Sequence, residues 1–130
     1  KVNKWIGIGR LTKDPELSYT PKGTAIARFY LAVQRNHKNE KGEYEADFIP
    51  IVVWREYAEF CAKHLQKGRL IAVSGRIRTR SYESEKGQRR YTWEVVADEI
   101  KFLDYPKNQQ MDDAPLGFTE TEINDDELPF

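Results

Sequence analysis

Apolar and polar residues alternate with a period of two in several short runs before residue 105, and polar turn signals separate these runs. In the run 25–34, one side is apolar and the other carries Arg28, Tyr30 and Gln34. Such alternation is typical of half-buried β-strands. We predict strands over residues 5–11, 25–34, 47–54, 69–82 and 91–102, a short extended piece that ends at Tyr19, and polar loops over 36–45 and 83–90.

Residues 55–68 carry a different pattern, because their apolar residues recur at helical spacing. These residues are Tyr57, Phe60, Cys61 and Leu65. Acidic residues come early in the segment and lysines come late, which suits the helix dipole. We predict a helix here, and we expect Gly68 to end it in a left-handed conformation.

The predicted order is three strands, a helix and two strands. This is the layout of an OB-fold, a five-stranded antiparallel Greek-key barrel with one helix between the third and fourth strands. Pro50 interrupts the third strand, which favours a sheet edge or a bulge at that point. The sequence therefore predicts an all-β domain of a class that commonly binds oligonucleotides.

The strand pattern stops near Tyr105. Residues 106–130 contain three prolines and many acidic residues, and they show no sustained strand or helix period. Such a stretch cannot bury enough apolar surface to offset the entropy of ordering. We therefore predict an OB-fold domain over residues 1–105, a short flexible linker over 106–124 and an acidic tip over 125–130, with the tail disordered.

Composition excludes several classes of protein. The chain has 130 residues, 39% hydrophobic and 32% charged, which is enough for one modest core. No apolar run reaches about 18 residues, so we expect no membrane span. The first residues lack the apolar run of a signal peptide, which favours a cytoplasmic protein. The single cysteine, Cys61, excludes an internal disulfide and a Cys-rich zinc site.

The formal net charge of zero hides a strong asymmetry. Residues 1–105 hold 20 Lys and Arg against 14 Asp and Glu, a net charge of +6. Residues 106–130 hold 1 Lys and 7 acidic residues, a net charge of −6. A basic body with an acidic tail indicates nucleic-acid binding in the body and protein interaction in the tail. The alternative is chance sorting of surface charge.

A row of arginines stands out in the fourth predicted strand. Arg76, Arg78, Arg80 and Tyr82 are spaced by two, which places three guanidiniums and a phenol ring on one face at intervals of about 6.6 Å. Like charges so placed repel one another, and a phosphate backbone is the ligand that would relieve the repulsion. The alternative is a solvated barrel face with acidic partners on the neighbouring strand.

The third predicted strand adds aromatic rings. Phe48 and Trp54 point the same way, opposite to the apolar face of that strand, which suggests stacking on nucleobases. The alternative places Trp54 in the core or in a subunit interface. We expect Phe29, Phe60 and Trp93 in the core, because they lie on periodic apolar faces.

Enzyme motifs are missing from the sequence. It contains no phosphate-binding loop, nucleophile elbow or zinc-protease motif. Neither His37 nor His64 has a second ligand at metal spacing, and Cys61 lies on the apolar side of the predicted helix. We therefore expect no catalysis, no cofactor, no metal and no small-molecule substrate.

The last six residues form a candidate protein-binding tip. They are Asp125, Asp126, Glu127, Leu128, Pro129 and Phe130. A partner with an apolar pocket rimmed by Lys or Arg can bind the terminal ring and carboxylate together. The alternative is an ordinary acidic terminus.

These features together resemble the bacterial single-stranded DNA-binding proteins, over about residues 2–103 and again at the tip. The matching motifs are Val2-Asn3-Lys4, Gly9-Arg10-Leu11, Asp14-Pro15-Glu16, Tyr19-Thr20-Pro21, Leu31-Ala32-Val33, Lys67-Gly68, Gly75-Arg76-Ile77-Arg78-Thr79-Arg80, Gly87-Gln88, Glu94-Val95-Val96-Ala97 and the terminal Pro129-Phe130.

The resemblance implies an OB-fold homotetramer, a dimer of dimers, wrapped by single-stranded DNA. It implies base stacking at Phe48, Trp54 and Tyr82. It also implies a cytoplasmic, nucleoid-associated protein whose tip recruits replication, recombination and repair proteins. Phosphate contacts are implied for Lys4, Lys67, Arg78 and Arg80.

Two departures from this pattern affect the candidate sites. His37 replaces an aromatic residue in the loop after the second strand, and the linker is short. The full set of candidate DNA contacts is Lys4, Arg28, Arg35, His37, Phe48, Trp54, Lys67, Arg76, Arg78, Arg80, Tyr82, Arg89 and Arg90. Two other functions stay open, an RNA-binding OB-fold module and a protein-interaction domain of a replication assembly that binds no strand.

Overall fold

The structure is a computed structural model that describes residues 1–104. Within these residues the elements are β1 (Trp5–Leu11), β2 (Glu16–Tyr19), β3 (Ala25–Lys38), β4 (Tyr44–Trp54), α1 (Glu56–His64), β5 (Leu70–Glu83) and β6 (Arg89–Phe102). The predicted order of strands and helix is therefore confirmed. No helix in this part of the chain is long and apolar enough to cross a membrane.

Five strands close into a barrel. The sheet order is β1-β5-β6-β4-β3-β2, and β1 also pairs with β3 through Leu11 and Leu31, which closes the ring and leaves β2 outside it. This is the predicted OB-fold, with α1 between the third and fourth barrel strands. One strand pair differs from the predicted antiparallel arrangement. Strands β4 and β6 run parallel, with Ile51 opposite Val95. The pairing of β4 with β6 starts at Ile51. Pro50 therefore pairs with β3 only and lies at an edge position, as predicted.

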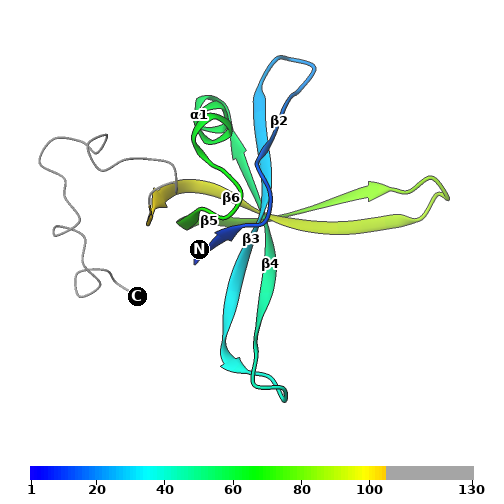
Figure 1. Cartoon of the computed structure of the whole chain (residues 1–130). Helices are drawn as coiled ribbons and strands as arrows, with labels where there is room; N and C mark the ends of the chain where they lie inside the picture. Colours follow the sequence, from blue (N-terminus) through cyan, green and yellow to red (C-terminus); the bar gives the residue numbers. More distant parts are fainter. Residues whose placement is uncertain (105–130) are drawn as a thin grey trace, which may run out of the picture.

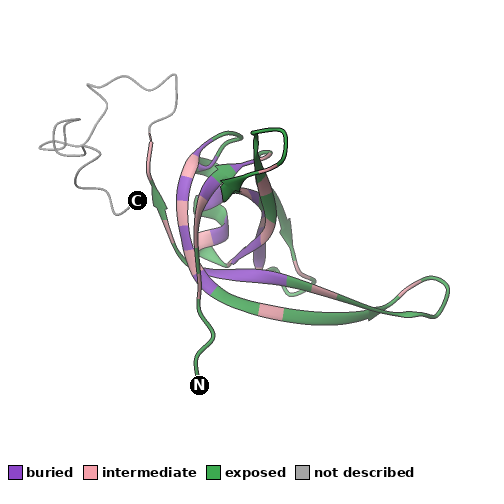
Figure 2. Ribbon diagram, turned by 90° about the horizontal axis from the view of Figure 1, so that it is seen from below, coloured by how far each residue is buried: buried purple, intermediate pink, exposed green. Residues whose placement is uncertain are grey.

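The core fills the inside of this barrel. Alternate residues of β3 and β4, including Phe29, Leu31 and Ile51, point inward and are buried. Helix α1 adds Ala58 and Cys61, which are both fully buried. Figure 2 shows the buried residues gathered in the ring of strands and exposed residues along the projecting hairpin.

Glycine allows the barrel to close. A Cβ atom at Gly9 would meet the backbone carbonyl of Ala32, and one at Gly75 would meet that of Val96. Both positions therefore require a residue without a side chain for the strands to come this close. Beside Gly75 the β5–β6 register shifts, which is a bulge that re-aims the second half of β5.

Two hairpins extend well beyond the barrel, in different directions (Figure 1). In the first hairpin, β3 ends at Lys38 and β4 begins at Tyr44. In the second hairpin, β5 ends at Glu83 and β6 begins at Arg89. The predicted polar loops are thus short turns at the ends of long two-stranded ribbons. Both faces of such a ribbon are exposed, so its strands are polar and resemble loops in sequence.

Three local predictions were wrong. Phe60 is 46% exposed because it lies on the exposed side of α1, where its ring stacks on the ring of Phe102 with centroids 6.2 Å apart. Trp93 is 41% exposed because it lies on the β6 ribbon past the end of the barrel. Helix α1 ends at His64, and Gly68 adopts its positive φ of 88° in the turn that follows rather than at the helix end.

Candidate nucleic-acid interface

The outer surface of β3, β4, β6 and β5 forms one continuous face, because these strands are neighbours in the sheet. The register places Arg28 opposite Val52, Val52 opposite Val96, and Val96 opposite Arg76. All of these side chains point away from the core, since their sequence neighbours point into it. We call this surface the outer face.

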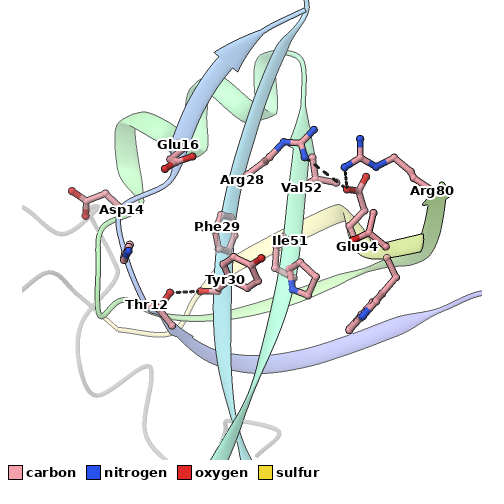
Figure 3. A pocket seen from close by; sticks show the side chains of 14 residues that line it. Thr12, Asp14, Glu16, Arg28, Phe29, Tyr30, Ile51, Val52, Arg80 and Glu94 are labelled. Carbon is pink, nitrogen blue, oxygen red and sulfur yellow. Dashed lines mark hydrogen bonds and ion pairs between the residues drawn. The ribbon is translucent and has the colours of Figure 1, made fainter. Parts of the chain in front are cut away.

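A first hollow of about 400 Å³ lies on the outer face beside the turn 12–16. Arg28, Tyr30, Pro50, Arg80 and Glu94 line it. Figure 3 shows Arg28 and Arg80 reaching toward Glu94 from opposite sides. The hollow is open to solvent, and its charged lining is balanced, with Lys13, Arg28 and Arg80 against Asp14, Glu16 and Glu94.

A second hollow of about 470 Å³ adjoins Trp54. Its walls carry Arg55, Arg76 and Arg78, with Asp98 as its acidic member. Arg76 and Asp98 form an exposed ion pair at 3.5 Å. Three guanidiniums against one carboxylate leave this hollow basic, unlike the first.

Glu94 organises the arginines between the two hollows. Glu94 is almost fully buried, at 5% exposure. The Arg78 guanidinium donates two hydrogen bonds to one carboxylate oxygen, the one from Nε at 3.0 Å. Arg80 and Arg28 approach the other oxygen at 3.4 and 3.9 Å. One buried carboxylate thus holds three guanidiniums, and a local charge of +2 is left over.

The predicted arginine row is therefore on one face, but it is not without acidic partners. Arg78 and Arg80 pair with Glu94, and Arg76 pairs with Asp98. The alternative of acids on the neighbouring strand is correct to this extent. Because each carboxylate offsets only part of the charge around it, the face stays positive and its arginines stay partly exposed.

None of the three predicted stacking rings lies in the barrel core. Phe48 is 61% exposed and Tyr82 is 55% exposed. Trp54 is half-buried on the outer face, where it packs on Val52 and Val96. The Arg78 guanidinium lies over the Trp54 ring, 5.4 Å from its centroid. This contact and the packing on Val52 and Val96 hold the Trp54 ring on the outer face.

Two of the other predicted contacts lie on the β3–β4 hairpin. Arg35 forms ion pairs with Asp47 at 2.8 Å and with Glu45 at 3.1 Å. The hydrogen bond from Arg35 lowers the pKa of the Asp47 carboxyl and raises the pKa of Arg35 itself. Arg35 is thus largely neutralised, whereas His37 is exposed near the end of β3.

The remaining basic residues lie around the outer face and along the β5–β6 hairpin. Lys4 is exposed in the segment before β1, which Asn3 fastens to β5 through two hydrogen bonds with Ile77. Lys67 follows α1, and its backbone N–H donates to Asp14 beside the first hollow. The last two candidates, Arg89 and Arg90, lie opposite Glu83 and Tyr82 on the hairpin.

Sequence reasoning missed two members of the outer face, Arg55 and Glu94. In the sequence, Arg55 fits the start of the predicted helix, although it directly follows Trp54. Glu94 lies among the apolar residues of β6, opposite Arg78. A single acidic residue at such a position is the feature of the sequence that indicates a partner for the arginines. Reading that signal requires the pairing register of β5 and β6, which periodicity alone does not supply.

Other chemistry finds no support in the described chain. Residues 1–104 contain no group of three or more His, Cys, Asp and Glu that could hold a metal ion. Burial raises the pKa of the Cys61 thiol to about 12, so it stays protonated and unreactive. The predicted linker and the tip at 125–130 lie outside the described residues.

We predict that Glu94→Gln destabilises the protein, because three guanidiniums lose their shared counter-charge. The expected loss is about 3 kcal/mol in the free energy of unfolding at low salt. Added salt screens the repulsion and recovers part of it. Urea unfolding at low and high salt measures both effects.

Asp98→Asn is the matched control for this substitution. It removes the same charge from an exposed ion pair, so its loss stays below about 1 kcal/mol. Equal small losses for the two variants would show that Glu94 does not hold the cluster together.

Three relatives resemble the chain over nearly its whole length. A single-stranded DNA-binding protein 2 of Clostridium acetobutylicum is 51% identical over 99% of this chain and 100% of its own. A single-stranded DNA-binding protein of Clostridium tetani is 49% identical over 98% of this chain and 94% of its own. A single-stranded DNA-binding protein 4 of Streptococcus agalactiae is 50% identical, with 99% of each chain covered.

The matching region coincides with the barrel and its hairpins. The model of the single-strand binding protein family matches residues 2–103, which include every strand and every residue of the outer face. The sequence match and the closed five-stranded barrel agree over the same stretch. The chain belongs to the single-strand binding protein family.

Proposed function

We propose that this protein binds single-stranded DNA without sequence preference through the outer face. One observation carries the proposal: partly exposed arginines and the rings of Phe48, Trp54 and Tyr82 lie outside the core of one barrel. The names of the relatives support DNA as the strand. Family and relatives alike indicate a binding protein and not an enzyme.

The mechanism combines charge with stacking. Arg28, Arg76 and Arg80 attract the phosphate backbone and release its counterions. The rings then stack on unpaired bases, which contributes about 1–3 kcal/mol per base. In a duplex the bases are already stacked on one another, so only the attraction between arginines and phosphates is left. Phosphates and base faces are common to all nucleotides, so this binding does not depend on sequence.

We predict that Trp54→Ala weakens the binding of oligo-dT by about 1–3 kcal/mol per subunit engaged, because one stacking ring is lost. The measurement is fluorescence anisotropy of labelled oligo-dT, which does not depend on the tryptophans themselves. Phe60→Ala is the matched control, since Phe60 is a half-exposed ring on α1 that lines neither hollow. Unchanged affinity of Trp54→Ala, or equal losses in both variants, would contradict stacking at Trp54.

We further propose that the protein assembles as a homotetramer, a dimer of dimers. The open edge of β1 supports this, because residues 5–9 pair with β5 on one side only. Ile6 lies on that stretch and is 75% exposed. An unpaired strand edge with an exposed apolar residue suits pairing with a second copy of the chain.

Ile6→Lys is therefore expected to lower the mass measured by light scattering, because the charge would be buried between copies. Leu17→Lys on β2 is the control, since it adds the same charge to an exposed apolar position at the other end of the sheet. Assembly that survives Ile6→Lys would contradict this use of the β1 edge.

We also propose that the tip at 125–130 recruits proteins of replication, recombination and repair. This recruitment takes place on the DNA of the nucleoid, in the cytoplasm. Three acids before Leu128 and Phe130 suit an apolar pocket with a basic rim. The same tail carries −6 against a body of +6, so it also competes with DNA for the basic face.

Deleting residues 125–130 is expected to leave oligo-dT binding unchanged or tighter, while pull-down of replication and repair proteins is lost. Asp112→Asn with Asp113→Asn is the control, because it lowers the tail charge and keeps the tip. Capture of the same partners by the truncated chain would refute the role of the tip.

A further inference from the structure

Arg55 has an unusual backbone. Its φ is 65° and its ψ is −141°, and it is the one non-glycine residue with positive φ among residues 1–104. A side chain strains the backbone in this region, whereas glycine adopts it readily. A glycine at this position would therefore fold at lower cost than the arginine that is present.

The surrounding structure forces this conformation. The backbone N–H of Arg55 donates to the carbonyl of Ala25 at 2.8 Å, which ties the residue to β3. Its carbonyl accepts from the N–H groups of Ala58 at 2.9 Å and Glu59 at 3.3 Å, which starts α1. The chain thus turns from β4 into α1 within a single residue. The Arg55 side chain takes no part in this turn, since it makes no capping hydrogen bond to the helix.

The side chain instead lines the second hollow, next to Trp54. The two hollows of the outer face contain five arginines, and four of them pair with Glu94 or Asp98. Arg55 is the fifth, and within residues 1–104 it forms no ion pair. It is also exposed. Its charge is therefore available to a ligand without first breaking a contact to a described carboxylate.

We propose that Arg55 binds a phosphate of the single strand, beside the base that stacks on Trp54. The inference rests on the proposed function and adds a contact residue to it. Strained backbone persists at functional sites when the residue does something that a relaxed one cannot. Here the strain places an uncommitted guanidinium directly after the stacking ring, where base and phosphate of one nucleotide are both within reach.

Three variants separate charge from strain. Arg55→Ala removes the charge and keeps the strain, Arg55→Gly removes both, and Arg55→Lys keeps both. Lys63→Ala is the charge control, because Lys63 is exposed on α1 outside the two hollows. Anisotropy titration of labelled oligo-dT over a range of salt gives affinity and salt slope, and urea unfolding gives stability.

Arg55→Ala and Arg55→Gly are both expected to bind several-fold more weakly at low salt, with a salt slope smaller by about 0.7 per subunit engaged. Arg55→Lys and Lys63→Ala keep the wild-type slope. The midpoint of urea unfolding rises for Arg55→Gly alone, since glycine relieves the strain. Weaker binding by a more stable variant is a result that a purely structural role for Arg55 does not produce.

Two results would overturn the inference in distinguishable ways. If the wild type binds oligo-dT and Arg55→Ala and Arg55→Gly keep its affinity and slope, Arg55 is not a phosphate contact and the proposed function stands. If the wild type itself does not bind oligo-dT, the proposed function fails and the inference fails with it.

Discussion

Mutual repulsion among arginines is the constraint that shapes this molecule's outer face. Arg28, Arg78 and Arg80 come from two strands on opposite sides of β4 and β6, and all three approach the Glu94 carboxylate. A buried carboxylate without these partners would be costly, and so would three guanidiniums without it. Together they form one ion-paired cluster with a net positive charge, and Arg78 of this cluster also lies over the Trp54 ring.

The geometry of the barrel positions this cluster. Closure of β1 on β3 at Leu11 and Leu31 curves the sheet, and the glycines at the crossing points allow strands to touch. The bulge beside Gly75 then aims the far half of β5 along the outer face. The proposed stacking rings and most of the proposed arginine contacts thus lie on strands rather than on loops, which favours a fixed geometry before any DNA binds.

Much of the fold could be predicted from the sequence, because alternation within a strand reports directly which side chains face the core. Alternation places Phe29 of β3 in the core for this reason, and the structure confirms it. The exposed rings Phe48 and Tyr82 follow from the same rule. Trp93 shows its limit, since the inward side of a strand is buried only as far as the barrel extends. Glu94 and Arg55 depend on strand register and on a single strained turn, and neither leaves a periodic signal.

Charge and stacking acting together are the central claim, and one comparison tests it most directly. Oligo-dT and an abasic strand of equal length carry the same phosphates, but only the first has bases. The account predicts parallel salt slopes for the two, with the abasic strand binding more weakly by about 1–3 kcal/mol for each ring engaged. Equal affinity for both strands would show that the rings take no part and would contradict the account.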